Sequence, residues 1–397
     1  MRIGPNIRSV TTETHVSTEG PRKSGRAAAL IIVALILLAA FVVGAPYLSR
    51  ALKQGLSFFS QLTTTGPGTQ TTGQSTTIQT TKSTTPNTNC SRVVSVRPLA
   101  APDIANGSAN ISYPGDYCEL ASYTLTLINA DRAANGSGPV TLDYNQAAQQ
   151  HADSMLYYGY FSHFDTQGLK PYMRYSLLGG LGADFENVAF FSYSANHYTS
   201  TGLVEEAIKV LERSMVYNDS ACCNNGHRYN ILDPLHNKVS IGLAYNGTHV
   251  YFDEEFLNDF INLNFATTGP TASNPLYVTM AGAPTHPFST PTSIYIAFDN
   301  TPSAETISQL NSGPHEYGPG TLEGGVLPKN GLLGTCGQFQ TGTTVCADKW
   351  TFSSTQVDIA FSLQKFRTTY GAGVYTIYLI TASSTSSAIT TISVFLP

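Results

Sequence analysis

Three short stretches of the sequence each carry a side chain that could bind a metal ion or transfer a proton. They are FSHFDTQG with His163, FENVAF with Glu186 and GHRYNILDP with His227. Two neutral imidazoles and one carboxylate can hold Zn²⁺ and leave a fourth position open to water, which is the ligand set of many catalytic sites. Such an ion could activate water or polarise a carbonyl group.

A complete catalytic site would need more than these three side chains. The sequence has no HExxH or GxSxG motif, and no clear nucleophile lies near the three stretches. Ser214 with His227 as its base would give a hydrolytic site, but a lone serine is usually a helix-surface or capping residue. The incomplete set therefore favours binding over catalysis.

The elements that must position these side chains can be read from periodicity. Apolar residues recur at helical spacing over residues 119–133, 145–160 and 203–215, which predicts three helices. Residues 239–257 alternate apolar and polar side chains around the turn AYNGT, as a β-hairpin does. Helices followed by paired strands indicate an α+β unit over residues 118–262.

Residues close to His163 also have predicted roles. Asp165 and Gly168 are turn formers that would fix the loop of His163. His151 lies inside the second predicted helix, and we interpret it as a packing or surface residue rather than a ligand.

The last third of the chain has a different sequence pattern. Short β-rich runs such as SIYIAF, VDIAFSL and GVYTIYLI are separated by Gly, Pro, Ser and Thr. We expect residues 275–397 to form an antiparallel β-sandwich of immunoglobulin-like type. Trp350 follows Cys346 too closely to reproduce the Cys, Trp, Cys spacing of true immunoglobulin domains.

The N-terminal part predicts a membrane anchor. Residues 27–45 carry no charged side chain, and as a helix they would span roughly 28 Å. Five Lys or Arg residues precede this segment and two follow closely, so we expect a cytoplasmic N-terminus (1–26), a transmembrane helix (27–48) and exported domains. The alternative is a cleaved signal peptide, because GAPYLSRA offers small residues at a cleavage position.

Residues 49–89 predict a stalk between the anchor and the domains. Sixteen of the 29 residues from 60 to 88 are Ser or Thr, so this segment cannot bury a core. Six Asn-x-Ser/Thr sequons make surface glycosylation plausible. They begin at Asn89, Asn106, Asn110, Asn135, Asn218 and Asn246.

The charge distribution argues against nucleic acid as a partner. Beyond residue 53 the chain holds 14 Lys and Arg against 24 Asp and Glu, so the exported part is acidic. A nucleic-acid-binding domain usually carries the opposite charge on its binding face.

All six cysteines follow the predicted anchor, where disulfides are the default. Cys336 and Cys346 are ten residues apart and predict a local hairpin clasp. Adjacent Cys222 and Cys223 are expected to bond to two different partners rather than to each other. The sequence lacks paired CxxC or CxxC and His motifs, which disfavours a structural zinc finger.

The phrases YFSH, FENVAF and GHRYNIL, in this order and followed by VSIGLAY, resemble the CAP superfamily, named for cysteine-rich secretory proteins, antigen 5 and pathogenesis-related proteins. These motifs are most similar to those of the microbial branch, and the resemblance covers residues 120–257. The resemblance implies an α-β-α sandwich and an open cleft with two His and two acidic residues, which binds a divalent cation in several members.

Carried over by position, His163, Glu186 and His227 match three members of this tetrad. The fourth acid falls at Ser214, so tight metal binding is in doubt. Glu212 lies two residues away on the same predicted helix, about 200° around it, and cannot simply replace the missing acid.

We expect, as the leading hypothesis, a membrane-anchored cell-surface binding module with surface proteins, glycans or lipids as partners. The cleft of His163, Glu186, His227 and Ser214 would bind zinc or another divalent cation through the first three residues. The alternatives are an extracellular metal-assisted hydrolase of peptide, glycan or lipid, and a carrier of lipid or sterol.

Overall fold

The structure is a computed structural model. It describes residues 116–193, 195–268, 276–288, 291, 293–313, 316–330, 334–339, 341–380 and 388–396. The predicted cytoplasmic segment, membrane helix and stalk lie outside these residues, as do Cys90 and the sequons at Asn89, Asn106 and Asn110. Within the described part of the chain, no helix is both long and apolar enough to cross a membrane.

A four-stranded sheet forms the centre of the first region. Its strands follow the order β1 (Thr141–Leu142), β3 (Lys238–Tyr245), β4 (His249–Asn258) and β2 (Ala183–Ser192). The short β1 pairs with β3 in parallel, whereas β3, β4 and β2 pair antiparallel. The hairpin predicted over residues 239–257 is confirmed as β3 and β4.

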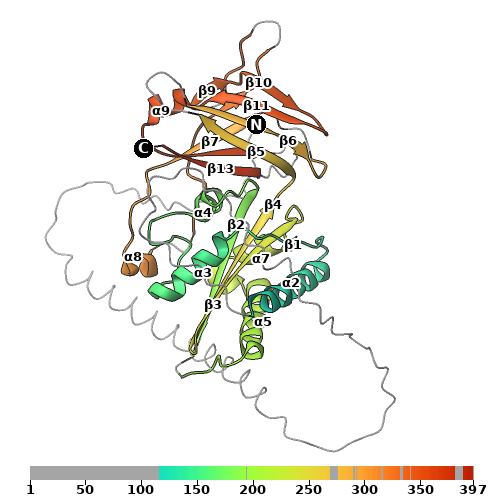
Figure 1. The fold of residues 1–397 in the computed structure, drawn as a ribbon, viewed down its shortest axis with the longest axis vertical. Helices are drawn as coiled ribbons and strands as arrows, with labels where there is room; N and C mark the ends of the chain where they lie inside the picture. The colour runs from blue at the N-terminus through green and yellow to red at the C-terminus, as the bar shows by residue number, and fades with distance from the viewer. Residues whose placement is uncertain are drawn as a thin grey trace, which may run out of the picture. The chain divides into compact units, whose positions relative to one another are not determined.

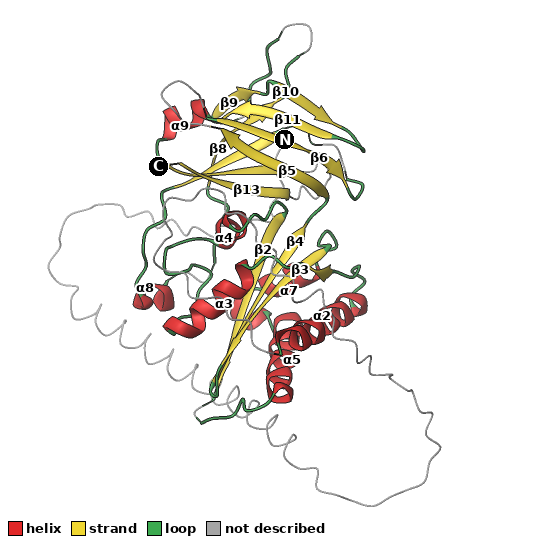
Figure 2. Ribbon diagram, viewed as in Figure 1, coloured by secondary structure: helices red, strands yellow, loops and turns green. Residues whose placement is uncertain are grey.

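Helices lie on both faces of this sheet (Figures 1 and 2). On one face are α2 (Tyr117–Ala134), α5 (Thr201–Tyr217) and α7 (Gly226–Leu232), and on the other lies α3 (Ala147–Tyr158). The three predicted helices are therefore confirmed as α2, α3 and α5. Three shorter helices were not predicted, namely α4 (Pro171–Leu177), α6 (Ser220–Cys223) and α7.

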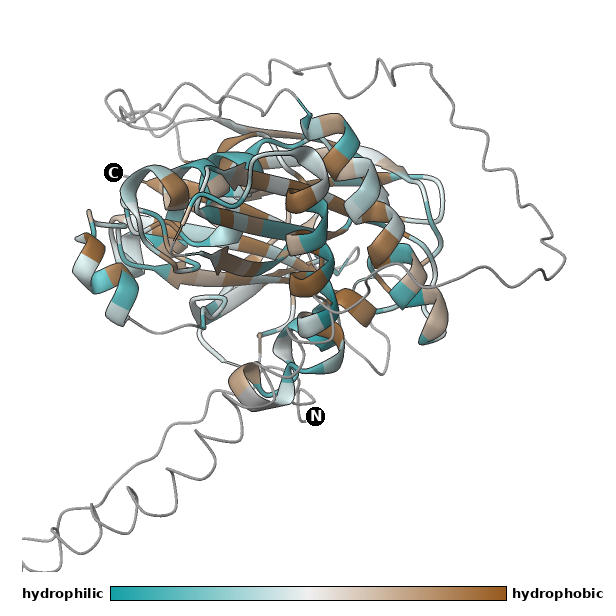
Figure 3. Ribbon diagram, turned by 90° about the horizontal axis from the view of Figure 1, so that it is seen from below, coloured by the Kyte–Doolittle hydropathy of each residue, from teal (hydrophilic) through white to brown (hydrophobic). Residues whose placement is uncertain are grey.

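The two faces have separate cores because successive side chains on a strand point to opposite sides. On β4, Phe252 and Phe256 pack with α2, α5 and α7, while Tyr251 packs with Met155 of α3. Figure 3 shows polar and apolar residues alternating along the helices and strands. This alternation decides which polar side chain of β2 and β4 meets which helix.

Gly242 of β3 allows α3 to approach the sheet closely. A Cβ atom at this position would overlap the backbone carbonyl group of Ala148. We expect Gly242→Ala to lower the free energy of unfolding by about 1–3 kcal/mol through overpacking, measured by urea denaturation.

Gly202 provides the matched control, because it lies in α5 and a Cβ atom at this position would meet no other atom within 4 Å. Gly202→Ala is expected to be neutral or to stabilise by up to about 1 kcal/mol. Equal effects of the two substitutions would contradict the close approach of α3.

The second region consists of two sheets that share one core. The four-stranded sheet contains β10 (Lys349–Phe352), β11 (Val357–Ser362), β6 (Tyr277–Pro284) and β5 (Ile261–Thr268). The five-stranded sheet contains β13 (Ala388–Leu396), β12 (Gly373–Ile380), β7 (Ile294–Asp299), β8 (Thr321–Leu327) and β9 (Thr343–Cys346). Buried residues of both sheets, including Met280, Ile359, Ile296 and Ile377, form a single cluster.

This arrangement confirms an all-β region with two short helices, α8 (Ile307–Ser312) and α9 (Gln364–Tyr370). Two details differ from the prediction. The sheet already begins with β5 at Ile261, before residue 275, and β8 pairs with β9 in parallel. The immunoglobulin-like type stays a prediction.

The disulfides confirm one prediction and contradict another. Cys336 and Cys346 form the expected clasp. Cys222 and Cys223 bond to each other, so the prediction of two different partners was wrong. Adjacent side chains diverge in a regular strand or helix, which favours two different partners. Here the two cysteines lie at the end of the four-residue helix α6, directly before a sharp reversal of the chain. Cys118 is disulfide-bonded as well.

Candidate functional site

The structure brings His163 and Glu186 into direct contact. Nδ1 of His163 lies 2.6 Å from Oε2 of Glu186, whose side chain is fully buried. His163 is held in its loop by the turn predicted from the sequence. Oδ1 of Asp165 accepts hydrogen bonds from the backbone N–H groups of Gln167 and Leu169, at 2.9 and 2.8 Å.

Arg174 of α4 lies at the centre of this contact. Its Nη2 forms an ion pair with Oε1 of Glu186. Its Nη1 donates to the carbonyl oxygens of His163 and Leu169, at 2.8 and 2.9 Å. One guanidinium thus fixes both the loop that carries His163 and the carboxylate that His163 contacts.

His151 belongs to the same cluster, against the interpretation of it as a packing or surface residue. It is buried, and its Nδ1 lies 3.0 Å from Oε1 of Glu186, Oδ2 of Asp253 and Nη2 of Arg174. A signal for this position exists in the sequence. His151 is four residues from Met155 on the apolar face of α3, where a polar side chain needs a partner.

We call His151, His163, Arg174, Glu186 and Asp253 the Glu186 cluster. Asp184 and Glu255 are buried beside it, and Glu255 lies opposite Glu186 in the register of β2 and β4. The strands therefore crowd four carboxyl groups against one arginine.

Burial decides which of these groups carry charge. It raises the pKa values of Asp184, Asp253 and Glu255 well above the ordinary range, so these carboxyls hold their protons. Burial alone would also raise the pKa of Glu186, but Arg174 and His151 hold it well below its usual value. Among these carboxyls, Glu186 is therefore the one whose charged form is stabilised, through its ion pair with Arg174.

By their spacing, His151, Glu186 and Asp253 could hold a metal ion, because one ligand atom from each lies within 4.8 Å of the others. Arg174 already fills part of this space, since its Nη2 contacts both His151 and Glu186. A divalent cation there would face a permanently charged guanidinium. The arrangement as it stands therefore does not fit a resident metal.

His227 and Ser214 do not join His163 and Glu186. Glu186 and Asn187 are successive residues of β2 and point to opposite faces of the sheet. Nδ2 of Asn187 reaches the carbonyl oxygen of His227 at 3.4 Å, on the side of α7. Ser214 is exposed on α5. The four residues expected in one cleft are thus divided between two faces.

A buried acid pair lies on this second face instead. Glu212 of α5 faces Glu254 of β4, and both carboxyls are buried. Burial raises the pKa of Glu212 well above its usual range and that of Glu254 to about 7. From the sequence, Glu212 was considered only as a replacement for the acid missing at Ser214, which its direction on the helix rules out. Nothing in the local sequence reveals its partner on β4.

Asn230 and Arg228 anchor the segment after His227. Nδ2 of Asn230 donates to the carbonyl oxygen of Phe185 and to Oδ1 of Asn187, both at 3.0 Å. Nη1 of Arg228 donates to the carbonyl oxygen of Val216 at 2.6 Å. These bonds tie α7 to β2 and α5.

A comparison with protein families matches residues 125–260 to the family described as CAP, the cysteine-rich secretory protein family. These residues form a CAP domain. This chain is also similar to a solved structure described as the CAP domain of Enterococcal PrgA. The two share 17% sequence identity, with a TM-score of 0.27. That match covers 35% of this chain and 59% of the Enterococcal chain. A search of curated proteins found no match.

The β-rich region covers the edge of the CAP domain next to the Glu186 cluster. The backbone N–H of Glu186 donates to the hydroxyl of Tyr317 at 2.9 Å, and that of Asp184 donates to Oγ1 of Thr391 at 3.3 Å. The Tyr317 ring lies 5.0 Å from the His163 ring. The unpaired edge of β2 is thus satisfied by residues far along the chain.

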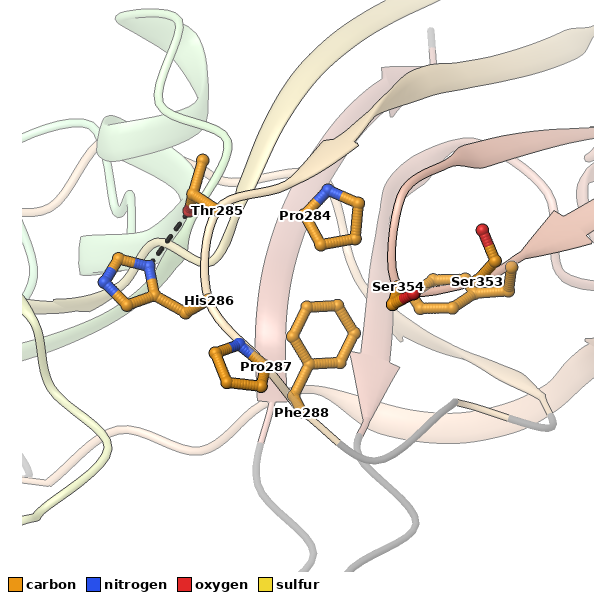
Figure 4. Close-up of a pocket in the computed structure, with 8 residues that line it drawn as sticks. Pro284, Thr285, His286, Pro287, Phe288, Ser353 and Ser354 are labelled. Atoms are coloured by element: carbon orange, nitrogen blue, oxygen red, sulfur yellow. Dashed lines mark hydrogen bonds between the residues drawn. The ribbon is translucent and has the colours of Figure 1, made fainter.

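Two open pockets lie elsewhere. One of about 290 Å³ is lined by Ser162 and Phe164, which flank His163, and by Leu310 of α8. The other, of about 330 Å³, lies in the β-rich region, where His286 and Phe288 line it together with Ser354 (Figure 4). Neither pocket is lined by His163, Glu186 or His227.

Proposed function

We propose that this chain is a membrane-held, exported binding protein in which the CAP domain is a non-catalytic scaffold. Its partners would be surface proteins, glycans or lipids rather than nucleic acid. The observation that carries this proposal is the pairing of Glu186, because both of its carboxylate oxygens already have partners inside the CAP domain.

A catalytic carboxylate must reach a substrate proton or a water molecule. Oε1 of Glu186 is engaged by Arg174 and His151, and Oε2 by His163. The Glu186 side chain has no exposed surface. These contacts support a bracing role, in which the Glu186 cluster fixes α3, α4 and the His163 loop against β2. The metal-assisted hydrolase is correspondingly less favoured.

Several features support export. The predicted anchor and stalk precede the CAP domain, and the described sequon residues Asn135, Asn218 and Asn246 are exposed. Disulfides form and persist outside the cytoplasm, and two pairs are formed in the described part of the chain. Secretion is also what the CAP family name suggests.

The test uses the full-length chain in two arms. Protease added to intact cells should digest the CAP domain and leave an N-terminal tag protected. In detergent, the purified chain should show no turnover of peptide, glycoside or ester substrates, whether zinc or a chelator is added.

The variant Glu186→Gln gives this test its discriminating control. Turnover that is lost both with chelator and in Glu186→Gln, at a temperature where circular dichroism shows the variant folded, would overturn the non-catalytic role. Protection of the CAP domain on intact cells would overturn the proposed location.

A further inference from the structure

We propose that Asp219, Cys222, Cys223 and His227 form a redox-switched metal site on the CAP domain. With the Cys222–Cys223 disulfide reduced, the four side chains would bind one thiophilic divalent cation such as zinc. With the disulfide formed, they would not.

The local backbone assembles these four residues within nine positions. After α5 ends at Tyr217, the short helix α6 carries both cysteines. Asn224 and Asn225 then adopt left-handed conformations, with φ values of 50° and 64°. Two successive non-glycine residues in this region are uncommon. This reversal starts α7 and turns His227 back onto Asp219.

The donor atoms are already close. Nδ1 of His227 lies 2.7 Å from Oδ1 of Asp219, and Sγ of Cys222 lies 3.6 Å from the same oxygen. One ligand atom from each of the four residues lies within 4.8 Å of all the others. A tetrahedral zinc site needs separations of about 3.3 Å between nitrogen and oxygen and about 3.8 Å between two thiolate sulfurs. Shifts of an ångström or less would bring His227 and Asp219 to this geometry.

The disulfide and the metal exclude each other. Bonded sulfurs are about 2.05 Å apart, whereas two zinc-bound thiolates are about 3.8 Å apart. A small dithiol would supply the two electrons and two protons that break the Sγ–Sγ bond, and would itself become a disulfide. Zinc would then displace the proton of each cysteine thiol to solvent.

The donor set selects the class of metal. Two thiolates, one imidazole and one carboxylate favour zinc and related soft or borderline cations over Mg²⁺ or Ca²⁺, which prefer oxygen ligands. Three negative charges from Cys222, Cys223 and Asp219 would be largely offset by the divalent cation. Unlike the Glu186 cluster, these four donors have no guanidinium among them: the Arg228 side chain reaches Val216 and Asn135 instead.

The site is accessible, as a switch must be. Cys222 is exposed, and the His227 side chain is 17% exposed. Asp219 is buried and accepts the backbone N–H of Arg228 at 3.1 Å, which orients its carboxylate. A dithiol can therefore reach the sulfurs while the carboxylate is held in place.

The experiment titrates Co²⁺, a spectroscopic probe for zinc sites, into the full-length chain. One sample is oxidised, and the other is reduced with dithiothreitol that is then removed under argon. We expect the reduced chain to bind one equivalent of Co²⁺ with a thiolate-to-cobalt charge-transfer band. The oxidised chain should show no such band.

Variants separate this site from the other cysteines, which the reductant also reaches. Cys222→Ser/Cys223→Ser should abolish the band, whereas Cys336→Ser/Cys346→Ser should retain it. His227→Ala should weaken Co²⁺ binding at least about 10–100-fold, the loss typical of changes even beyond the direct ligands. Circular dichroism of each variant checks the fold.

Three outcomes would overturn the proposal. They are a reduced chain without the band, a band that persists in Cys222→Ser/Cys223→Ser, and Co²⁺ affinity unchanged in His227→Ala. The first would leave the Cys222–Cys223 disulfide as a purely structural bond within α6.

Discussion

Arg174→Met should lower the free energy of unfolding by about 3–5 kcal/mol, the usual cost of breaking a buried ion pair by removing one partner. Methionine keeps much of the length of the side chain but leaves the Glu186 carboxylate buried without its cation. It also removes the donors to the carbonyl oxygens of His163 and Leu169. Chemical denaturation at neutral pH measures the effect.

Two comparisons sharpen this result. The double variant Arg174→Met/Glu186→Gln removes both charges and should be more stable than Arg174→Met alone. Lys329→Met, which breaks the exposed pair with Asp348, should cost less than about 1 kcal/mol. Equal losses for the buried and the exposed pair would contradict the central role of Arg174.

Glu254→Gln should become increasingly stabilising as pH rises. Burial raises the pKa of Glu254 from 4.5 to about 7, so the folded state keeps a proton that the unfolded state releases. This group therefore makes the wild type lose stability as pH rises from about 4.5 to 7, and the glutamine variant lacks this loss. The shift corresponds to about 3 kcal/mol, and the difference between the two chains should level off above pH 7.

Urea denaturation at pH 5 and pH 8 measures this difference. Glu206→Gln, on the exposed side of α5, serves as control and should stay within about 0.5 kcal/mol of wild type at both pH values. A Glu254→Gln advantage that is the same at both pH values would show that the proton is not retained on folding.

The fold was predictable where local pattern and tertiary structure agree. The helices α2, α3 and α5 and the β3–β4 hairpin were recognised because their buried faces repeat at 3.6 or two residues. The start of the β-rich region was missed because β5 follows β4 closely and no change of pattern separates them.

The candidate site was predictable only in part. His163 and Glu186 were identified from short sequence motifs that resemble those of the CAP superfamily, and their side chains are in contact. Arg174 and Asp253 were missed because their meaning depends on pairing with Glu186 across the fold. His227 is separated from Glu186 because it lies on the face of the sheet to which Asn187 points. No spacing in the sequence reveals on which face His227 lies.

The cysteine pair shows the same limit on a smaller scale. Spacing rules for zinc fingers do not include adjacent cysteines with a histidine four residues further on. Only the reversal at Asn224 and Asn225 places His227 against Asp219 and the two sulfurs. A ligand set can therefore arise from a turn rather than from a motif.

The hydroxyls of Tyr317 and Thr391 that reach the outer edge of β2 bear on how the protein is divided into modules. The family match ends at residue 260, yet two backbone groups beside the most buried charges are satisfied by residues more than fifty positions further on. A CAP domain cut from this chain at the end of the family match would therefore leave the backbone N–H groups of Asp184 and Glu186 without these two acceptors.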